Sequence, residues 1–477
     1  MQDIQVHIAI IGAGTAGISA YTAARKQTNS LILLEGGHHG TTCARVGCMP
    51  SKLLIAAAEA AHQMELAPNL GVTAKAGIEI DGEQVMHRLK SERDRFVSFA
   101  VADVDNLPAE HRLDEFAHFT GPNTLETSSG KKITARNIII ATGSSTFIPE
   151  NFKAAEDRLI TNDDVFSWND LPKSIAVFGP GVIGLELSQA LSRLGVRVSL
   201  FGRGGALGPI QDEKVREVAL ANFKQEFNLC TKAEVSSIKR VEAGVEVIYT
   251  DPEGATHTEV YDYLLAATGR RPNLDKLNLA ATGLKLDERG QPEFNPETSQ
   301  AINADGSQSH IFIAGDVAAF RPLLHEANDE GFNAGTNAAN WPEVKPRSRR
   351  TPLAVVFTEP QIGFAGASLP QLEAEYGADK IAIGEVDFTR QGRARVMQQN
   401  QGLIRFYAHK DNGKLLGAEI FTPRAEHFAH LLAWSIQQGL SLAELLEMPF
   451  YHPVMEEGLR SGLRNTLNQI KKPTTKK

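Results

Sequence analysis

Apolar and polar positions near the start of the chain form a buried run, an amphipathic stretch and a second buried run. Residues 6–11, "VHIAII", are apolar and β-branched and predict a strand. The following stretch predicts a helix through Arg25, and "SLILLE" over 30–35 predicts the next strand. A strand, a helix and a strand in this order are typical of a βαβ unit in a parallel sheet.

The same order recurs further along the chain. "SIAVF" over 174–178 predicts a strand, a helix follows it to Leu194, and Gly195 ends that helix. Two similar segments, each a strand and a turn, flank this second fold: "IIIATGS" over 138–144 and "LLAATGRRPN" over 264–273. The pattern therefore predicts two βαβ folds.

A different pattern follows the second fold. A strand that ends before Gly315 leads into a predicted helix over 323–339. The basic, proline-containing stretch 342–352 is typical of a linker. Beyond it we expect strands of a meander and then helices over 425–448, which together form a third, α+β unit.

Composition and charge narrow the class of protein. Of 477 residues, 42% are hydrophobic and 22% are charged, as in globular proteins with a large core. The net charge of −8 offers no basic field for nucleic acid. The N-terminus "MQDIQVHIAIIGAG" lacks a secretory pattern, and no apolar run is long enough for a bilayer. We therefore expect a cytoplasmic protein that binds neither nucleic acid nor membrane.

Glycines at fixed spacing follow the first predicted strand. Gly12 suits the tight turn, Gly14 lets the backbone approach a pyrophosphate, and Gly17 lets helix and strand pack closely. The helix N-terminus faces the phosphates, and Glu35 after the second strand reaches a ribose hydroxyl. This combination predicts a dinucleotide site.

The second fold repeats these glycines but not the acid. Gly179, Gly181 and Gly184 follow its strand. Eighteen residues after the third glycine, where the first fold has its acid, stands Gly202, followed by Arg203. A ribose 2′-hydroxyl loses its usual acceptor there, and a guanidinium suits a 2′-phosphate better. The alternative is that Arg203 is only a solvated loop residue.

Two of the three cysteines form a close pair, Cys43 and Cys48, followed by Pro50 and Lys52. Structural zinc is typically held by two such pairs, and the chain has no second pair, so we expect no metal site. The third cysteine, Cys230, is isolated and is interpreted as a small packed residue.

Together these motifs resemble the flavoprotein disulfide reductases, the class I pyridine nucleotide-disulfide oxidoreductases. The resemblance rests on both glycine fingerprints, Cys-x4-Cys-x-Pro-Ser-Lys, the two Ala-Thr-Gly turns, Gly-Asp and the terminal "HPVMEE", and it covers nearly the whole chain. It implies an α/β fold with two Rossmann-like dinucleotide-binding domains, for FAD and NAD(P), and a C-terminal α+β dimerisation domain. The expected boundaries are 1–148 and 270–344 for the FAD domain, 149–269 for the NAD(P) domain, 345–470 for the interface domain and 471–477 for a disordered tail.

The resemblance also implies the cofactors and the residues that bind them. FAD would be bound tightly and non-covalently, and NAD or NADP would be the co-substrate. The expected FAD residues are Gly12, Gly14, Gly17, Glu35, Thr42, Lys52, Thr142, Gly143, Ser144, Gly315, Asp316, Leu323 and Leu324. The expected NAD(P) residues are Gly179, Gly181, Val182, Ile183, Gly184, Glu186, Arg203 and Gly269.

In this family the cysteine pair is a redox disulfide. The resemblance implies that Cys48 faces the flavin, that Cys43 exchanges with the substrate, and that Lys52 pairs with Glu186 beside the flavin. It further implies that His452 and Glu457 form an acid–base dyad that serves the disulfide of the other subunit. A homodimer with shared active sites follows from that arrangement.

Within the family, "LLHEANDEG" and "GVIGLEL" are similar to dihydrolipoamide dehydrogenase. Thr41, Ala44, Arg45 and Phe450 depart from that enzyme's usual pattern, as does Gly202-Arg203. This similarity implies a dihydrolipoyl dehydrogenase acting on a dihydrolipoyl group, free or on a carrier protein. Membership of a 2-oxoacid dehydrogenase complex stays open. The alternatives are an NADPH-dependent reductase of another disulfide or of a quinone, a transhydrogenase and a non-enzymatic scaffold.

Overall fold

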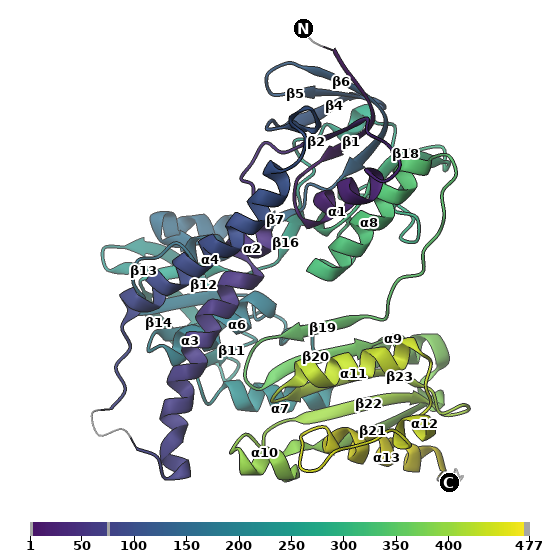
Figure 1. Cartoon of the computed structure of the whole chain (residues 1–477). Helices are drawn as coiled ribbons and strands as arrows, with labels where there is room; N and C mark the ends of the chain where they lie inside the picture. The colour runs from purple at the N-terminus through teal and green to yellow at the C-terminus, as the bar shows by residue number, and fades with distance from the viewer. Residues whose placement is uncertain (1–2, 74–76, 472–477) are drawn as a thin grey trace. The chain divides into compact units, whose positions relative to one another are not determined.

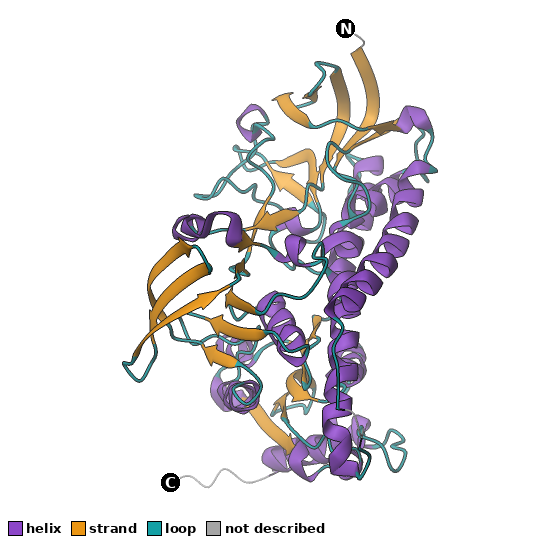
Figure 2. Cartoon of the chain, turned by 90° about the vertical axis from the view of Figure 1, so that its left-hand side faces the viewer, coloured by secondary structure: helices purple, strands orange, loops and turns teal. Residues whose placement is uncertain are grey.

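The computed structural model describes residues 3–73 and 77–471 (Figure 1). The chain divides into two compact units that alternate along the sequence. Unit 1 comprises Met1–Pro50, Arg88–Phe147 and Gly269–Arg349, and unit 2 comprises Ser51–His87, Ile148–Thr268 and Arg350–Lys477. Both are mixtures of helices and strands (Figure 2). The tail predicted for 471–477 lies outside the described residues, apart from Lys471 at the end of the last helix.

The first predicted βαβ unit forms the centre of unit 1. Strand β1 (Asp3–Ile11) is followed by α1 (Thr15–Ala24) and by β2 (Leu31–Leu34), as the apolar pattern predicts. β1 pairs in parallel with β2 on one side and with β6 (Lys132–Ile140) on the other. Because strands of a parallel sheet are buried on both faces, all four residues of β2 are buried.

The sheet of unit 1 has eight strands, with the path β17-β18-β6-β1-β2-β3 and a hairpin of β4 and β5 beside β6. The other elements that lie wholly in this unit are α2 (Thr42–Val46), β3 (Arg112–Leu113), β4 (Ala117–Gly121), β5 (Thr124–Thr127), β7 (Ser144–Thr146), β16 (Arg270–Pro272), β17 (Gln300–Ile302), β18 (Gln308–Ile313) and α8 (Leu324–Asn340). Two helices cross the division between the units, α3 (Cys48–Leu66) and α4 (Gly82–Asp105).

Helices α1 and α8 lie side by side (Figure 1). Gly331 and Gly335 of α8 make this contact close, because a Cβ at these positions would come within 2.2 Å and 2.1 Å of the carbonyl oxygens of Ala16 and Ala20. Small residues one turn apart therefore allow the two backbones to touch. The contact fixes α8 against the helix that begins at the first glycine fingerprint.

Unit 2 contains the second βαβ fold and the C-terminal part of the chain. A five-stranded sheet has the order β11-β10-β9-β15-β8, and all its pairings are parallel. The elements around this fold are β8 (Leu159–Ile160), α5 (Asn162–Val165), β9 (Ser174–Phe178), α6 (Val182–Arg193), β10 (Arg197–Phe201), α7 (Glu213–Phe223), β11 (Asn228–Cys230), β12 (Glu234–Val241), β13 (Gly244–Thr250), β14 (Thr256–Tyr261) and β15 (Tyr263–Ala266).

The C-terminal part forms an antiparallel sheet with the order β19-β20-β23-β22-β21. The predicted strands are present, but the meander was wrong, because β20 pairs with β23 and not with the next strand along the chain. Its elements are β19 (Leu353–Val356), β20 (Gln361–Gly366), α9 (Leu369–Tyr376), β21 (Ile381–Asp387), α10 (Gly392–Val396), β22 (Leu403–His409), β23 (Leu415–Thr422), α11 (Ala425–Gln437), α12 (Leu442–Leu446) and α13 (Glu457–Lys471).

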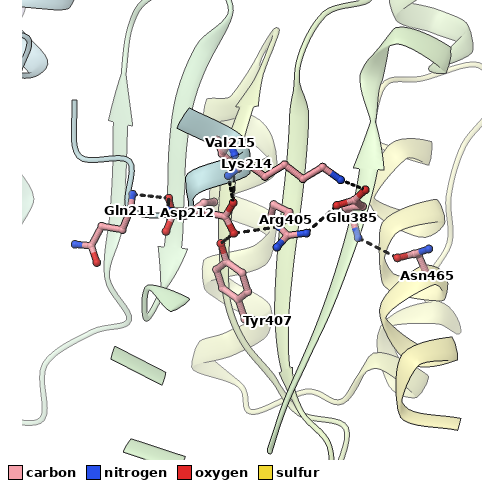
Figure 3. A network of polar contacts seen from close by, with 9 residues as sticks. Gln211, Asp212, Lys214, Val215, Glu385, Arg405, Tyr407 and Asn465 are labelled. Carbon is pink, nitrogen blue, oxygen red and sulfur yellow. Dashed lines mark hydrogen bonds and ion pairs between the residues drawn. The ribbon is translucent and has the colours of Figure 1, made fainter. Parts of the chain in front are cut away.

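A buried polar network ties α7 to this C-terminal sheet (Figure 3). Asp212 caps α7 by accepting hydrogen bonds from two backbone N–H groups of the first turn. Its other oxygen accepts from Arg405 Nε at 3.0 Å and from Tyr407 Oη at 2.9 Å, both on β22. Glu419 of β23 accepts the N–H groups of Gln211 and Asp212 at 2.9 Å. Because buried polar groups are costly to leave unpaired, the network holds the start of α7 in place.

Candidate functional site

The two glycine fingerprints have the same backbone geometry. Gly12 and Gly179 both have φ of +108°, which only glycine adopts readily. A Cβ would lie 2.4 Å from Ala141 O at Gly12 and 2.3 Å from Ala267 O at Gly179. Each Ala-Thr-Gly turn predicted from the sequence therefore packs against the first glycine of one fingerprint.

The second and third glycines of each fingerprint differ in the space around them. A Cβ at Gly17 would lie 1.8 Å from Gly12 O, and one at Gly184 would lie 2.0 Å from Gly179 O, so both are required for packing. By contrast, nothing lies within 4 Å of a Cβ at Gly14 or Gly181. Open space at the N-terminus of a helix fits a pyrophosphate that approaches the backbone closely. The residues present thus fit a dinucleotide at both fingerprints.

The structure places Gly202 at the position that Glu35 occupies in unit 1. Gly12 N–H donates to Leu34 O at 2.7 Å, and Gly179 N–H donates to Phe201 O at 2.8 Å, so the residues that follow are equivalent. Glu35 accepts the N–H groups of Ala13 and Gly37 at 2.9 Å and 2.8 Å.

No side chain fits easily at Gly202. A Cβ there would lie 2.7 Å from Cγ of Pro180, which stands between the first two glycines of the second fingerprint. The next residue, Arg203, is exposed. At the position of Glu35 the second fold therefore has a glycine, followed by the guanidinium of Arg203.

Polar side chains gather where β6 and β18 end. Ser144 Oγ donates to Asp316 Oδ2 at 2.9 Å, and Arg270 Nε donates to Ser144 Oγ at 2.8 Å. Thr142 and Asn273 exchange two hydrogen bonds, of 2.8 Å and 2.9 Å. Arg270 and Asn273 were not predicted as site residues, although both lie in the motif "ATGRRPN" that the sequence singles out.

The residues near α8 that the sequence predicts to bind FAD lie before this helix or at its start. Gly315 has φ of +83° and precedes Asp316, which begins a short 3-10 turn. Leu323 is the N-cap of α8 and Leu324 is its first residue. The partial positive charge at the N-terminus of this 17-residue helix favours a group that carries negative charge.

The two cysteines stand at the starts of two consecutive helices. Cys43 is the second residue of the short α2, and Cys48 is the first residue of α3. Gly47 breaks the helix between them with φ of −127° and ψ of −114°. Cys43 is half-buried and Cys48 is exposed. The N-terminus of a long helix favours the thiolate form of a cysteine such as Cys48.

Thr41, the residue before α2, has a strained backbone and caps that helix. Thr41 has φ of +57°, an unusual value for a β-branched residue. Its hydroxyl accepts the N–H of Ala44 at 3.3 Å and caps α2. The cap bond accompanies a strained backbone that a glycine would adopt more easily.

Lys52 and Glu186 form an ion pair within unit 2. Lys52 Nζ lies 2.8 Å from Glu186 Oε2, and Glu186 is almost completely buried. Phe357 contributes twice: its N–H donates to Glu186 Oε1 at 2.8 Å, and its ring lies 4.4 Å from Lys52 Nζ. Lys52 follows Cys48 by one turn of α3, so one helix carries the exposed cysteine and the paired lysine.

His452 and Glu457 also lie together in unit 2. His452 Nδ1 is 3.0 Å from Glu457 Oε1, and Glu457 begins α13. The hydrogen bond from His452 holds the pKa of Glu457 below its usual value. An ionised carboxylate accepts from Nδ1–H, which leaves Nε2 of this exposed imidazole able to take a proton. The arrangement is that of an oriented acid–base pair.

A small cavity beside the ion pair was not predicted from the sequence. Its lining includes Ile55, Glu59, Glu186, Gln189, Arg193 and Glu359. Burial raises the pKa of Glu359 to about 7; the carboxylates of Glu59 and Glu226 add to this rise, whereas the guanidinium groups of Arg193 and Arg424 oppose it.

This shift predicts a pH-dependent stability. The ordinary pKa of a glutamate is about 4.3, so the folded chain binds this proton more tightly than the unfolded chain. The stabilisation is complete below the unfolded pKa and is lost as the pH rises through about 7. The free energy of unfolding is expected to fall between about pH 5 and 8, and Glu359→Gln is expected to reduce this fall by about 2–3 kcal/mol. Urea unfolding at both pH values measures this, with the exposed Glu373→Gln as control. An unchanged pH slope contradicts the assignment.

Three further features concern the third cysteine, metal binding and the length and polarity of the helices. Cys230 is buried, and burial raises the pKa of its thiol, so it is poorly suited to redox chemistry. Within residues 3–73 and 77–471, no group of three or more His, Cys, Asp or Glu side chains could hold a metal ion. In the same part of the chain, every helix is too short or too polar to cross a membrane.

Comparison with known proteins agrees with this geometry. The family model for pyridine nucleotide-disulphide oxidoreductases matches residues 6–338, and the model for the dimerisation domain of that family matches residues 353–462. A dihydrolipoyl dehydrogenase of Geobacillus stearothermophilus is 29% identical over 461 residues, which cover 95% of this chain and 94% of the relative. A mercuric reductase of Lysinibacillus sphaericus is 30% identical over 463 residues, which cover 94% of this chain and 81% of the relative.

Solved structures show the same fold. LpdA from Mycobacterium tuberculosis has a TM-score of 0.80 at 22% identity, and the HOCl-induced flavoprotein disulfide reductase RclA from Escherichia coli has 0.78 at 22%. Each match covers 96% of this chain and 99% of the other. The predicted fold class is therefore confirmed, and the dimerisation domain supports a homodimer. The chain belongs to the class I pyridine nucleotide-disulphide oxidoreductases, enzymes that bind FAD and use NAD(P).

Proposed function

We propose that this enzyme is dihydrolipoyl dehydrogenase-like and passes electrons between a dithiol, the Cys43–Cys48 pair, FAD and NAD(P). One observation carries the proposal: α3 presents the exposed Cys48 one turn before Lys52, which is paired with the buried Glu186 of the second nucleotide fold. The dihydrolipoyl dehydrogenases among the relatives, similar over almost their whole length, support the substrate class.

The two fingerprints would hold the two nucleotides. FAD would lie against Gly12, Gly14 and Gly17, with Glu35 on its adenosine ribose and Asp316 on its ribityl chain. FAD supplies a two-electron carrier between thiols, which react through sulfur, and a nicotinamide, which exchanges hydride. In this assignment 1–148 with 270–344 forms the FAD domain, 149–269 the NAD(P) domain and 345–470 the interface domain.

The thiol chemistry assigns a role to each remaining side chain. His452 Nε2 takes the proton of one dihydrolipoyl thiol, and Glu457 holds the imidazole at Nδ1. The resulting thiolate attacks Cys43 Sγ and breaks the Cys43–Cys48 bond, which leaves Cys48 as a thiolate. The second substrate thiol, deprotonated in turn, displaces Cys43 and closes the substrate disulfide. Both protein cysteines are then reduced. The dyad would come from the partner subunit of the homodimer.

Arg203 favours NADP(H) over NAD(H) in this proposal. Position 202 carries no carboxylate for a ribose 2′-hydroxyl, and a Cβ there would lie only 2.7 Å from Pro180 Cγ. Arg203→Gln is expected to raise the KM for NADPH about 10–100-fold, since a charge-assisted contact contributes about 1.5–3 kcal/mol, and to leave the KM for NADH unchanged. Steady-state kinetics with both nucleotides measure this, with the exposed Lys239→Gln on β12 as control. Equal changes for both nucleotides contradict the assignment.

The substrate class is tested with purified enzyme and a panel of substrates. Free dihydrolipoamide and a lipoylated carrier domain are assayed with NAD and NADP, and glutathione disulfide and a quinone with NADH and NADPH. Rapid oxidation of the dithiols supports the proposal, and the preferred form identifies a free or carrier-bound substrate. The arginine beside the second fingerprint favours one alternative, an NADPH-dependent reductase. If glutathione disulfide or the quinone turns over faster than every dithiol, the proposal is replaced by an NADPH-dependent reductase. If no substrate turns over, the result indicates a scaffold.

A further inference from the structure

A buried cluster of charges joins the segment after α8 to the turn that carries Gly315. Arg349 lies in the stretch that the sequence predicts to be a linker, yet its side chain is only 15% exposed. Its Nη2 lies 2.9 Å from Glu326 Oε2 and also contacts Glu330 Oε1, both on α8. The end of unit 1 is therefore anchored to this helix.

Glu330 connects the arginine to the backbone of the turn. Its second oxygen, Oε2, accepts the N–H of Gly315 at 2.7 Å. Burial raises the pKa of Glu330, and Arg349 and the Gly315 N–H oppose that rise. Arg349 thus helps to keep Glu330 ionised as an acceptor, and a continuous chain of contacts runs from Arg349 through Glu330 to Gly315.

A second ion pair of the cluster holds the loop between Asp316 and α8. Arg321 Nη1 donates to Glu326 Oε1 at 3.2 Å. The ring of Phe320 lies 4.4 Å from the guanidinium carbon of Arg349 and 5.4 Å from that of Arg321. The loop is therefore attached at its beginning through Glu330 and near its end through Glu326. Two carboxylates balance two guanidinium groups in this cluster.

We propose that Arg349 and Glu330 are positioning residues of the flavin site, which hold the Gly315–Asp316 turn and balance the charge next to it. The inference rests on the proposed placement of FAD at this turn and at the start of α8. Charges that are buried are screened less than surface charges, so the loss of either partner leaves a field that a bound flavin would experience. Because reduction adds negative charge to a flavin, its midpoint potential reports the sign of that field.

The test compares the midpoint potential of the bound FAD in full-length variants. In Glu330→Gln the amide oxygen still accepts from Gly315 N–H, and the unbalanced Arg349 is expected to make the potential more positive. In Arg349→Gln one positive charge is lost beside the carboxylates of Glu326 and Glu330. Measured at alkaline pH, which keeps Glu330 ionised without the arginine, the potential is expected to become more negative. The double variant removes both charges and is expected to return toward the wild-type value. A residue with only a structural role would not give shifts of opposite sign.

Hydrogen exchange of the FAD-loaded protein provides a second readout. Amide exchange over residues 315–323 is expected to be about tenfold faster in Arg349→Gln, equivalent to about 1.4 kcal/mol, and unchanged in Arg347→Gln. Arg347 is a suitable control because it lies in the same linker and its side chain is exposed, with the guanidinium 5.3 Å from the ring of Phe332. If Arg349→Gln does not retain FAD, Arg349→Lys, which keeps the charge without the planar fork, takes its place in the exchange measurement.

The outcomes separate this inference from the proposed function. The inference is overturned if the potential of Glu330→Gln is not more positive than that of Arg349→Gln, or, where Arg349→Gln retains no FAD, than that of wild type. Unchanged exchange over 315–323 in the arginine variant overturns the holding role. Failure of the proposed function is seen elsewhere, in a wild-type protein that binds no FAD or oxidises no dithiol.

Discussion

Cys48→Ser is expected to abolish reduction of the bound FAD by dihydrolipoamide, while reduction of the same FAD by NADPH persists. In the proposed mechanism Cys48 provides the thiolate between substrate and flavin, and a serine hydroxyl is not a redox group. The dithiol-dependent rate should fall at least about 10³-fold, which corresponds to about 4 kcal/mol of activation free energy. Anaerobic stopped-flow absorbance of the flavin, with dithiol or NADPH as reductant, measures both half-reactions separately.

The third cysteine provides the control. Cys230 lies buried in β11 of unit 2, and Cys230→Ala is expected to keep both half-reactions at wild-type rates. Dithiol-dependent reduction that survives in Cys48→Ser and is lost in Cys230→Ala would contradict the redox pair. Loss of both half-reactions in Cys48→Ser would indicate damage to the flavin site instead and would remove the support for a specific thiol role.

His452→Gln is expected to lower dithiol oxidation by about 10²–10⁴-fold at neutral pH, because general acid–base catalysis typically contributes that factor. The glutamine cannot take up the thiol proton. The defect should shrink as the pH approaches the pKa of the substrate thiols, since pre-formed thiolate needs no base. A pH profile of kcat/KM for dihydrolipoamide measures this, and NADPH-dependent flavin reduction should be unaffected.

Another exposed histidine serves as the control for this substitution. His87 lies exposed on α4, and His87→Gln is expected to behave as wild type. Glu457→Gln should give a smaller loss than His452→Gln, because the imidazole stays present but loses the carboxylate that orients it at Nδ1. A defect in His452→Gln that does not vary with pH would show that the imidazole does not act as the base.

Much of the fold could be predicted from local pattern. The run "VHIAII" lies in β1, the predicted helix over 323–339 becomes α8 over Leu324–Asn340, and the strands predicted after the linker are present, although not in the order of a meander. These predictions succeed because burial of apolar side chains has a period of two in half-buried strands and about 3.6 in helices, and gives continuous apolar runs in parallel sheets. Glycine spacing was equally informative, because Gly12 and Gly179 meet steric limits that no other residue satisfies.

Contacts between distant parts of the chain could not be predicted from local pattern. The pairing of Lys52 with Glu186 was expected only from the family resemblance, and the N–H of Phe357 that completes it was not expected at all. The contacts of Arg349 were not expected either: the sequence placed it in a linker, and its side chain pairs with two carboxylates of α8.

Local pattern in the chain was sufficient for the two βαβ folds, the order of the elements and the residue types able to carry redox chemistry. The partners of charged side chains, the cavity beside Glu186 and the shifted pKa of Glu359 depended on the packed structure. The physical reason is that periodic burial acts between neighbours along one element. The environment of a charge depends instead on which elements meet and on how much water they exclude.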